Sequence, residues 1–363
     1  MSLRRLLSIV IKELRQLRRD RLTFAMIIGI PTMQLLLFGF AINLDVRHLD
    51  AAVLDQANTA RSRELVAELG AGQVLNLRSA LSSPQQLDEL LREGRISVGV
   101  VIPPDFENRL ERGDRAALQL VVDGSDQVVQ QAARQLAAFP LVQLRGNATP
   151  AAAVEVVNFY NPERRAPVNT VPGLVGVILT MTMVMFTAMA LVRERERGNL
   201  EMLIATPVSP WELTLGKVLP FIAIGLVQVS LVLALGKLIF AVPLRGSVFD
   251  IYLAALLFII ASLALGVFLS TLARTQFQAM QLAFFTFLPQ ILLSGFMFPY
   301  AGMPRAAQWL AEILPMTHFL RLIRGIALRG ATLADLWTEL AALAAFSTIM
   351  LGIAVMRVSK RLD

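Results

Sequence analysis

The sequence predicts an all-α polytopic membrane protein with six transmembrane helices, cytoplasmic N and C termini, and one inserted α/β domain outside the cytoplasm. Of the 363 residues, 55% are hydrophobic and only 17% are charged, whereas soluble domains are usually near half apolar and a quarter charged. The mean hydropathy is +0.60. Six segments are apolar over the roughly 20 residues that cross a bilayer, and one long polar stretch separates the first two of them.

Residues 1–21 are predicted to form an amphipathic helix at the cytoplasmic surface of the membrane. Their apolar positions recur at helical spacing, with arginine and lysine on the opposite side. Such a helix lies in the headgroup layer and attracts anionic lipids. It could be a surface anchor only, or it could brace a cytoplasmic partner. Because the charged region is long and the next apolar segment is long enough to span, we expect this helix to be retained and not cleaved as a signal peptide.

The six apolar segments are the predicted transmembrane spans. They cover residues 22–42, 173–192, 218–242, 251–272, 277–298 and about 334–356. The start of the last span is the least well defined, because Asp335 and Glu339 fall in its first turns. Seven arginines and lysines precede the first span and three follow the last. The positive-inside rule therefore places both ends in the cytoplasm, as an even number of spans also requires.

Residues 43–170 are predicted to form a single α/β domain outside the cytoplasm. Three apolar runs that end in turn residues predict buried strands, at 51–55, 95–103 and 116–126. Two segments have helical spacing, at 62–69 and 84–94. Strands that alternate with helices indicate one small domain with its own core. The insert has no apparent catalytic constellation, because His48 stands alone and the acids and bases are scattered.

A charged segment with two prolines, "RERERGNLEMLIATPVSPWELTLGK" at 193–217, interrupts the apolar sequence between the second and third spans. The orientation given above makes it cytoplasmic. Its first part places leucine and isoleucine on one face and charges on the other, which predicts a short amphipathic helix. Pro207 should stop that helix, and Ser209-Pro210 with Glu212 has the pattern of a new helix start. We expect a rigid helix–elbow–helix on the inner membrane face; the alternative is an ordinary solvated loop.

The order of these features resembles the membrane subunits of type-2 ABC exporters. In that family a span ends in an Arg-Glu pair, followed by Gly, Leu-Glu, Leu and Thr-Pro, and then by a Gly-Lys that enters the next span. Here those positions are Arg195-Glu196, Gly198, Leu200-Glu201, Leu203, Thr206-Pro207 and Gly216-Lys217. The chain departs from the pattern in two ways, because the Arg-Glu pair is doubled and Asn199 stands where threonine is commoner.

Two further stretches extend the resemblance over nearly the whole chain. "LPMTHFLRLIRGIALRG", residues 314–330, looks like the family's segment ahead of the last span. The insert, including "RISVGVVIPPDFENRLERGDRAALQLVVDGSD", is similar to the extracytoplasmic domain of the YbhS/YbhR/YhhJ-type branch. As in the family, residues 299–330 are expected to form short helices that dip into the outer leaflet and not a seventh span.

The resemblance implies that the charged segment is a coupling element that sits in a groove of a separate ATPase. The residues expected to make this contact are Arg193, Glu194, Arg197, Glu201, Leu203, Thr206 and Pro207. The chain has no Walker A pattern, because its Gly-Lys pairs at 216–217 and 236–237 lack the upstream glycine and a following Ser or Thr. We therefore expect no cofactor, metal or catalytic residue in this chain, with ATP and Mg²⁺ bound by the partner ATPase.

Cargo would pass at the interface of a dimer, because six spans enclose little space. Candidate pathway-lining residues in the second span are Thr180, Met181, Met183 and Thr187, where flexible methionines suit varied apolar ligands. Candidates in the fifth span are Gln278, Gln281 and Gln290, whose amides need partners in lipid. The alternative is that these polar residues hydrogen-bond at helix–helix seams.

The sequence therefore favours a permease subunit in the bacterial inner membrane that exports an amphiphilic, drug-like or lipid-like molecule. It would pair with a second copy or a paralogue and bind an ABC ATPase subunit, and the external domain would gate exit or dock a periplasmic membrane-fusion adaptor. No nucleic-acid partner is expected, because the basic N-terminal residues flank a membrane span. A non-transporting assembly factor or a sensor is the alternative. An ion-coupled carrier is disfavoured, because Lys237 is the only charge well within a span.

Overall fold

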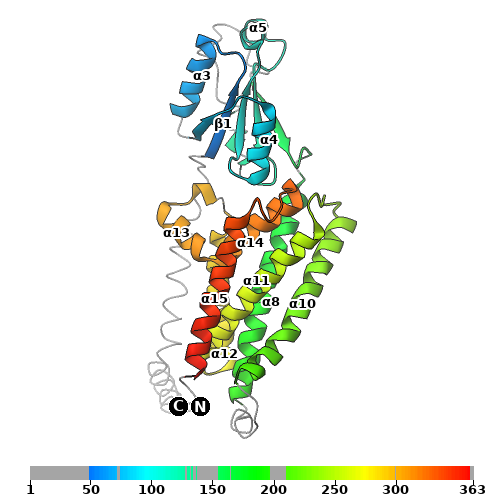
Figure 1. Ribbon diagram of the computed structural model, residues 1–363, viewed down its shortest axis with the longest axis vertical. Helices are drawn as coiled ribbons and strands as arrows, with labels where there is room; N and C mark the ends of the chain where they lie inside the picture. The colour runs from blue at the N-terminus through cyan, green and yellow to red at the C-terminus, as the bar shows by residue number, and fades with distance from the viewer. Residues whose placement is uncertain are drawn as a thin grey trace, which may run out of the picture.

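The computed structural model describes two connected parts, a sheet domain and a bundle of long helices (Figure 1). It covers residues 49–71, 74–126, 129–130, 132–133, 136, 154–163, 165–196, 210–298 and 300–359. The predicted N-terminal helix, the predicted first span at 22–42 and residues 197–209 of the charged segment lie outside the described residues. The side chains of residues 210–219 are also outside them.

The sheet domain is built on a five-stranded sheet with the order β2-β1-β3-β4-β5. The strands are β1 (Leu49–Asp55), β2 (Leu75–Ala80), β3 (Val98–Ile102), β4 (Leu118–Asp123) and β5 (Val154–Phe159). β1 is parallel to β2 and β3, β3 is antiparallel to β4, and β4 is parallel to β5. The three predicted strands are confirmed as β1, β3 and β4, whereas β2 and β5 were not predicted.

Helices cover both faces of this sheet. They are α3 (Ala60–Ala71), α4 (Pro84–Glu93) and α5 (Phe106–Arg112). α3 and α5 contribute to the larger core cluster, and α4 packs Leu87 and Leu91 on a second cluster. The Ser83 side chain caps the start of α4 by accepting a hydrogen bond from the Gln86 amide, and Gly94 ends the helix with φ 73°. α3 and α4 lie at the two predicted helical segments, and α5 is an addition.

Five long helices of the bundle fall within the part of the chain that the structure describes. They are α8 (Ala166–Glu196), α10 (Pro210–Leu238), α11 (Val248–Leu272), α12 (Gln276–Leu293) and α15 (Trp337–Ser359). Among the described residues, three helices are long and apolar enough to cross a membrane, and these are Ala166–Glu196, Pro220–Leu238 and Val248–Leu272. They match the predicted second, third and fourth spans. α12 and α15 occupy the predicted fifth and sixth positions, but α12 carries four glutamines and the apolar part of α15 is only Trp337–Ile353.

Four short helical segments lie between the bundle and the sheet domain (Figure 1). They are η1 (Tyr300–Gly302), α13 (Arg305–Ile313), α14 (Pro315–Arg324) and the π-helical turn η2 (Gly325–Arg329). Gly330 ends this run in the left-handed region with φ 71°, where glycine avoids the steric cost of a side chain. The segment predicted at 299–330 is therefore made of short helices.

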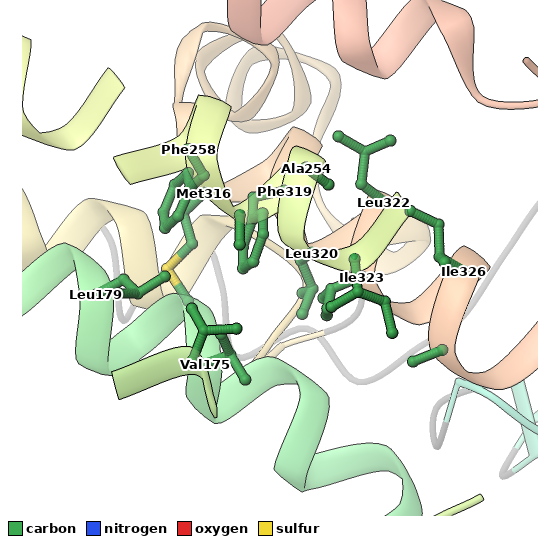
Figure 2. Close-up of a cluster of buried hydrophobic side chains, with 14 of the residues drawn as sticks. Val175, Leu179, Ala254, Phe258, Met316, Phe319, Leu320, Leu322, Ile323 and Ile326 are labelled. Atoms are coloured by element: carbon green, nitrogen blue, oxygen red, sulfur yellow. The ribbon is translucent and has the colours of Figure 1, made fainter. Parts of the chain in front are cut away.

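The centre of the bundle is α11, which packs against α8, α10, α14 and α15. Of the most apolar stretch of α11, 67% is buried inside the structure. Figure 2 shows the cluster where α8, α11 and α14 meet. The rings of Phe258 and Phe319 stack with centroids 4.3 Å apart and an interplanar angle of 7°. Close packing of the two rings holds α14 to α11 although α14 is short.

Candidate functional site

The end of the bundle away from the sheet domain, called the distal end here, holds the start of the charged segment in a polar clamp. The clamp consists of Arg193, Arg195 and Glu196 on α8 and Gln276 at the start of α12. The Glu196 carboxylate accepts hydrogen bonds from the Gln276 backbone N (2.9 Å) and Nε2 (2.5 Å). Arg193 Nε donates to Gln276 Oε1 at 3.2 Å. The single Gln276 amide thus bridges two charged residues of α8.

Arg195 strengthens the same junction from the next position on α8. Its guanidinium donates to the backbone carbonyls of Ser270 (3.0 Å) and Ala273 (3.3 Å), where α11 ends. A cation at a helix C terminus also interacts favourably with the helix dipole. The last turn of α8 is therefore tied to both α11 and α12, and a force applied just beyond Glu196 would act on three helices together.

Of the predicted ATPase-contact residues, the structure describes only Arg193 and Glu194, both in the last turns of α8. Arg193 belongs to the clamp. The other five lie outside the described residues, namely Arg197, Glu201, Leu203, Thr206 and Pro207. The contact itself stays a prediction.

The predicted pathway-lining residues of α8 fall on different sides of the helix. Met181 is 44% exposed on the bundle surface, whereas Thr180, Met183 and Thr187 are buried. The Thr180 hydroxyl donates to the Gly176 carbonyl at 2.8 Å within its own helix. Thr187 packs against α11, where a Cβ on Gly266 would lie 2.9 Å from its Cβ. In this single chain, only Met181 of the four is available to cargo or to a second subunit.

The glutamines of α12 serve mainly local hydrogen bonds. Gln278 is buried, and its Oε1 accepts from the Arg274 amide at 2.9 Å. Gln290 is buried, and its Nε2 donates to the Thr286 carbonyl at 3.4 Å. Gln281 is half-buried, and its Oε1 has no hydrogen-bond partner among the described residues. Both of these bonds are local to α12 and neither reaches another helix, and the Gln290 Oε1, like that of Gln281, has no hydrogen-bond partner among the described residues.

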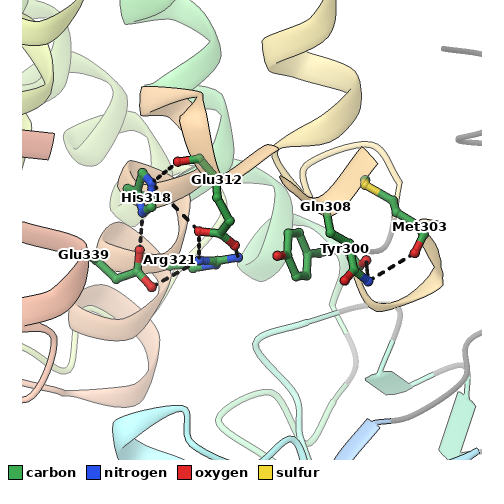
Figure 3. Close-up of polar contacts among 7 residues, drawn as sticks. All are labelled: Tyr300, Met303, Gln308, Glu312, His318, Arg321 and Glu339. Carbon is green, nitrogen blue, oxygen red and sulfur yellow. Dashed lines mark hydrogen bonds and ion pairs between the residues drawn. The ribbon is translucent and has the colours of Figure 1, made fainter. Parts of the chain in front are cut away.

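At the end of the bundle nearest the sheet domain, called the proximal end, a charged network joins α13, α14 and α15 (Figure 3). Arg321 donates to both Glu312 oxygens, at 2.5 Å and 3.0 Å, and to Glu339 at 3.2 Å. His318 Nδ1 lies 2.5 Å from Glu339 Oε2, and its Nε2 lies 2.8 Å from the Glu312 carbonyl oxygen. The Arg321 guanidinium also stands over the Tyr300 ring, 4.6 Å from its centroid.

This network engages both His318 and Glu339. His318 has a structural role, because both of its ring nitrogens contact oxygen atoms of neighbouring residues. Burial lowers the pKa of His318, but the hydrogen bonds to Glu339 and to the Glu312 carbonyl outweigh it, so the pKa is raised above 6.5. Glu339, at the start of α15, is the partner of both Arg321 and the His318 ring.

Ion pairs also hold the sheet domain on the proximal end. Arg329 of η2 reaches Asp123 at the end of β4, with Nη1 and Oδ2 3.3 Å apart. Arg92 of α4 pairs with Asp335, again at 3.3 Å. Arg324 Nη1 lies 3.8 Å from Asp126. These three arginine–aspartate contacts cross from one part of the chain to the other, and the sequence had not identified them.

The described residues contain no group of three or more His, Cys, Asp or Glu side chains that could hold a metal ion. The polar side chains at both ends are instead engaged in contacts between helices and between the two parts.

Residues 21–356 match the family described as "ABC-2 family transporter protein". The chain is similar to "Probable multidrug ABC transporter permease YbhR" of Escherichia coli (strain K12), with 31% identity over 342 residues that cover 93% of each chain. It is also similar to "Probable multidrug ABC transporter permease YbhS" of that strain, with 28% identity over 373 residues that cover 100% of this chain and 99% of the relative. "Inner membrane transport permease YhhJ" of the same strain is 26% identical over 386 residues, covering 99% and 98%. These similarities include both the sheet domain and the bundle.

Proposed function

The chain belongs to the ABC-2 family of transporter proteins, as a permease subunit that is not itself an ATPase, and we propose that it exports an amphiphilic, drug-like or lipid-like molecule. The energy comes from ATP and Mg²⁺ bound by a separate ABC ATPase subunit. Two relatives are named probable multidrug transporter permeases, which supports an apolar or amphiphilic cargo over an ion or a sugar.

The observation that carries this proposal is the distal clamp. Gln276 bridges Arg193 and Glu196 where the charged segment begins, and Arg195 ties the same turn to α11. A mechanical input needs a stiff entry point, because a flexible loop would absorb the movement. The clamp supplies that stiffness at the end of the bundle opposite to the sheet domain (Figure 1).

In this proposal, segment 193–217 lies in the cytoplasm and contacts the ATPase. The contact residues are Arg193, Glu194, Arg197, Glu201, Leu203, Thr206 and Pro207. The chain crosses the membrane six times, with 22–42 as the first span and both termini in the cytoplasm. ATP-driven closure of the ATPases moves segment 193–217 and rotates the helices on either side of it.

The export pathway is proposed to lie between two permease subunits, either identical copies or paralogues. Met181 supports this location, because it is the exposed member of the lining set on α8 and methionine adapts to varied ligands. The Gln281 Oε1 on α12 is buried without a hydrogen-bond partner among the described residues, which supports a polar contact there in the assembled transporter. The buried candidates Thr180, Met183 and Thr187, with Gln278 and Gln290, are then neighbours that shape the seam.

The sheet domain is proposed to be extracytoplasmic and to gate exit or to dock a periplasmic membrane-fusion adaptor. It sits at the proximal end, so in a spanning bundle it faces the side opposite to the charged segment (Figure 1). The proposed location is the bacterial inner membrane, which agrees with the name of the relative YhhJ.

Co-purification tests this function. The permease is expressed with candidate ATPases, and ATP hydrolysis is measured across a panel of lipids, drugs and cations in proteoliposomes. We expect one ATPase to bind and one class of amphiphile to stimulate hydrolysis and to be exported. The variants Glu194→Lys and Glu201→Lys should keep hydrolysis but lose export.

Two results would overturn the proposal. One is full export by the Glu194→Lys and Glu201→Lys variants, since the coupling role then fails. The other is uphill transport by the permease alone, without any ATPase. Binding of an ATPase with no transport of any tested molecule would instead favour the assembly-factor alternative.

A further inference from the structure

Arg165 connects the remote ends of the two helices that flank the charged segment, α8 and α10. It lies between β5 and α8, immediately before Ala166. Its Nη1 and Nη2 donate to the carbonyls of Phe240 (3.3 Å) and Ala241 (2.9 Å), just beyond the end of α10. α8 ends and α10 begins at the two sides of residues 197–209, so Arg165 closes the α8–α10 hairpin at the end remote from that segment.

α10 is the least embedded of the three long apolar helices. Only 22% of the most apolar stretch of α10 is buried inside the structure, compared with 50% for α8 and 67% for α11. Among the described residues, side-chain hydrogen bonds join it to its neighbours from Thr182 Oγ1 to Gln228 Oε1 at 2.9 Å and between Ser230 Oγ and the Tyr252 hydroxyl at 2.5 Å. α8, by contrast, is tied to α11 and α12 at the clamp. A push on the charged segment would therefore displace α10 further than α8.

The described residues of the connection between β5 and α8, at 160–163 and 165, are called the stalk here, and hydrogen bonds brace them. Asn161 brackets Arg165, because its Oδ1 accepts from the Arg165 amide and its Nδ2 donates to the Arg165 carbonyl, each at 3.0 Å. The Phe159 carbonyl accepts from both Gly124 and Asn161, which ties the stalk to the turn after β4. Movement delivered to Arg165 would reach the sheet with little loss.

Arg245, in the loop between α10 and α11, makes a second contact between this loop and the stalk. Its Nη2 donates to the Tyr160 carbonyl at 3.4 Å, and its guanidinium lies over the Tyr160 ring, 5.4 Å from the centroid. Tyr160 and Ala241, on the two sides of this junction, have φ values of 66° and 48°. Non-glycine residues keep such conformations only where the surrounding contacts hold them.

We propose that α10 transmits movement of the charged segment across the bundle to the sheet domain. Arg165 is the positioning residue that passes this movement from the end of α10 to the stalk. The inference rests on the proposed function, because the movement originates at the ATPase contact. Displacement of α10 pulls the Phe240 and Ala241 carbonyls, Arg165 follows, and the stalk tilts the sheet domain on the proximal end.

Distance measurements on the assembled transporter test this. The chain has no cysteine, so Asp114→Cys in the sheet domain and Ile313→Cys on α13 give one spin-label pair. Both positions are exposed. The complex of permease and ATPase is measured in nanodiscs without nucleotide and after trapping with ATP and vanadate. We expect the distance distribution to shift on trapping, and we expect Arg165→Ala to abolish the shift while basal ATP hydrolysis continues.

Two further variants make the result specific. Arg165→Lys keeps a charge and a donor, so it should fold and show an intermediate shift. Arg63→Ala removes a comparable arginine-to-carbonyl bond, to Asn58 within the sheet domain at 3.1 Å, and should leave the shift intact. A full shift in Arg165→Ala, or no shift in an unmodified complex that exports normally, overturns the inference and leaves the proposed function standing. Failure of the unmodified permease to bind any ATPase overturns both.

Discussion

Arg329 Nη1 lies 3.3 Å from Asp123 Oδ2 across the boundary between the bundle and the sheet domain, and the two side chains are only 11% and 7% exposed. The Arg329 guanidinium also occupies the space beside Gly94, where a Cβ would collide with it. A nearly buried ion pair thus joins the last residue of β4 to the last residue of η2, and it holds the sheet domain on the bundle.

Removing one partner of this nearly buried pair should loosen the sheet domain. Arg329→Ala leaves Asp123 with an uncompensated charge, which costs about 3–5 kcal/mol when a pair is truly buried. Hydrogen exchange in β4 and α4 should accelerate accordingly. The control is Arg78→Ala, which breaks the exposed Arg78–Asp50 pair (2.8 Å) and should cost at most about 1 kcal/mol. Equal changes in hydrogen exchange in the two variants would show that the Arg329–Asp123 pair does not hold the sheet domain on the bundle.

The raised pKa of His318 makes the attachment of α13 and α14 to α15 depend on pH. Protonated His318 is stabilised by Glu339 and the Glu312 carbonyl, whereas Arg321 opposes the charge. The stabilisation is complete below about pH 6.5 and is lost as the pH rises through the higher folded pKa. The thermal unfolding midpoint in detergent should fall over that range, and His318→Gln should remove the dependence.

Nuclear magnetic resonance can assign this titration without ambiguity. The chain has two histidines, His48 and His318, so His48→Gln leaves a single imidazole signal. Its midpoint should lie above the ordinary value of about 6.5. A midpoint below that value would mean that burial outweighs Glu339, and the pH dependence would reverse.

The seam between α8 and α11 should not tolerate an added methyl group. A Cβ on Gly266 would lie 2.9 Å from both the Thr187 Cβ and the Val184 carbonyl oxygen, and the latter cannot move without the α8 backbone. Gly266→Ala should destabilise the bundle by about 1–3 kcal/mol. Gly352→Ala on α15 meets nothing within 4 Å and should be neutral or stabilise by up to about 1 kcal/mol. Similar unfolding midpoints for the two variants would contradict the close packing.

Breaking the distal clamp should uncouple hydrolysis from export. Gln276→Ala removes the side-chain bonds to Arg193 and Glu196, so movement of the charged segment would be absorbed locally. The number of molecules exported per ATP should fall several-fold, while ATPase binding persists. Gln119→Ala is the matched control, because it removes an exposed glutamine–glutamate bond of 2.9 Å in the sheet domain. An unchanged ratio in Gln276→Ala would argue against the clamp as an entry point.

Much of the fold could be predicted because it depends on local patterns. The apolar runs of β1, β3 and β4 and the leucine spacing of α3 and α4 are properties of short segments. β2 was missed because only Leu75 of its six residues is buried, so its apolar signal is weak. β5 pairs with β4 across a long stretch of chain, and no local pattern records that pairing.

The polar contacts at the proximal end could not be predicted, because they join distant residues. Arg92 and Asp335, and Asp123 and Arg329, are brought together only by the docking of the sheet domain. The sequence did hold a usable signal. Arg245, Arg324 and Arg329 flank membrane helices on the predicted outer side, where the positive-inside rule disfavours them. Arginines in such places need acidic or aromatic partners, which the sheet domain supplies.

Sidedness is the most direct test of the central claim that work enters through segment 193–217 from the cytoplasm. Because the chain has no cysteine, Glu201→Cys and Asp114→Cys each introduce a single thiol. A membrane-impermeant maleimide is applied to intact cells and to inverted vesicles. The account predicts that Glu201→Cys is labelled only in inverted vesicles and Asp114→Cys only in intact cells whose outer membrane is permeabilised. Labelling of Glu201→Cys from outside would contradict it.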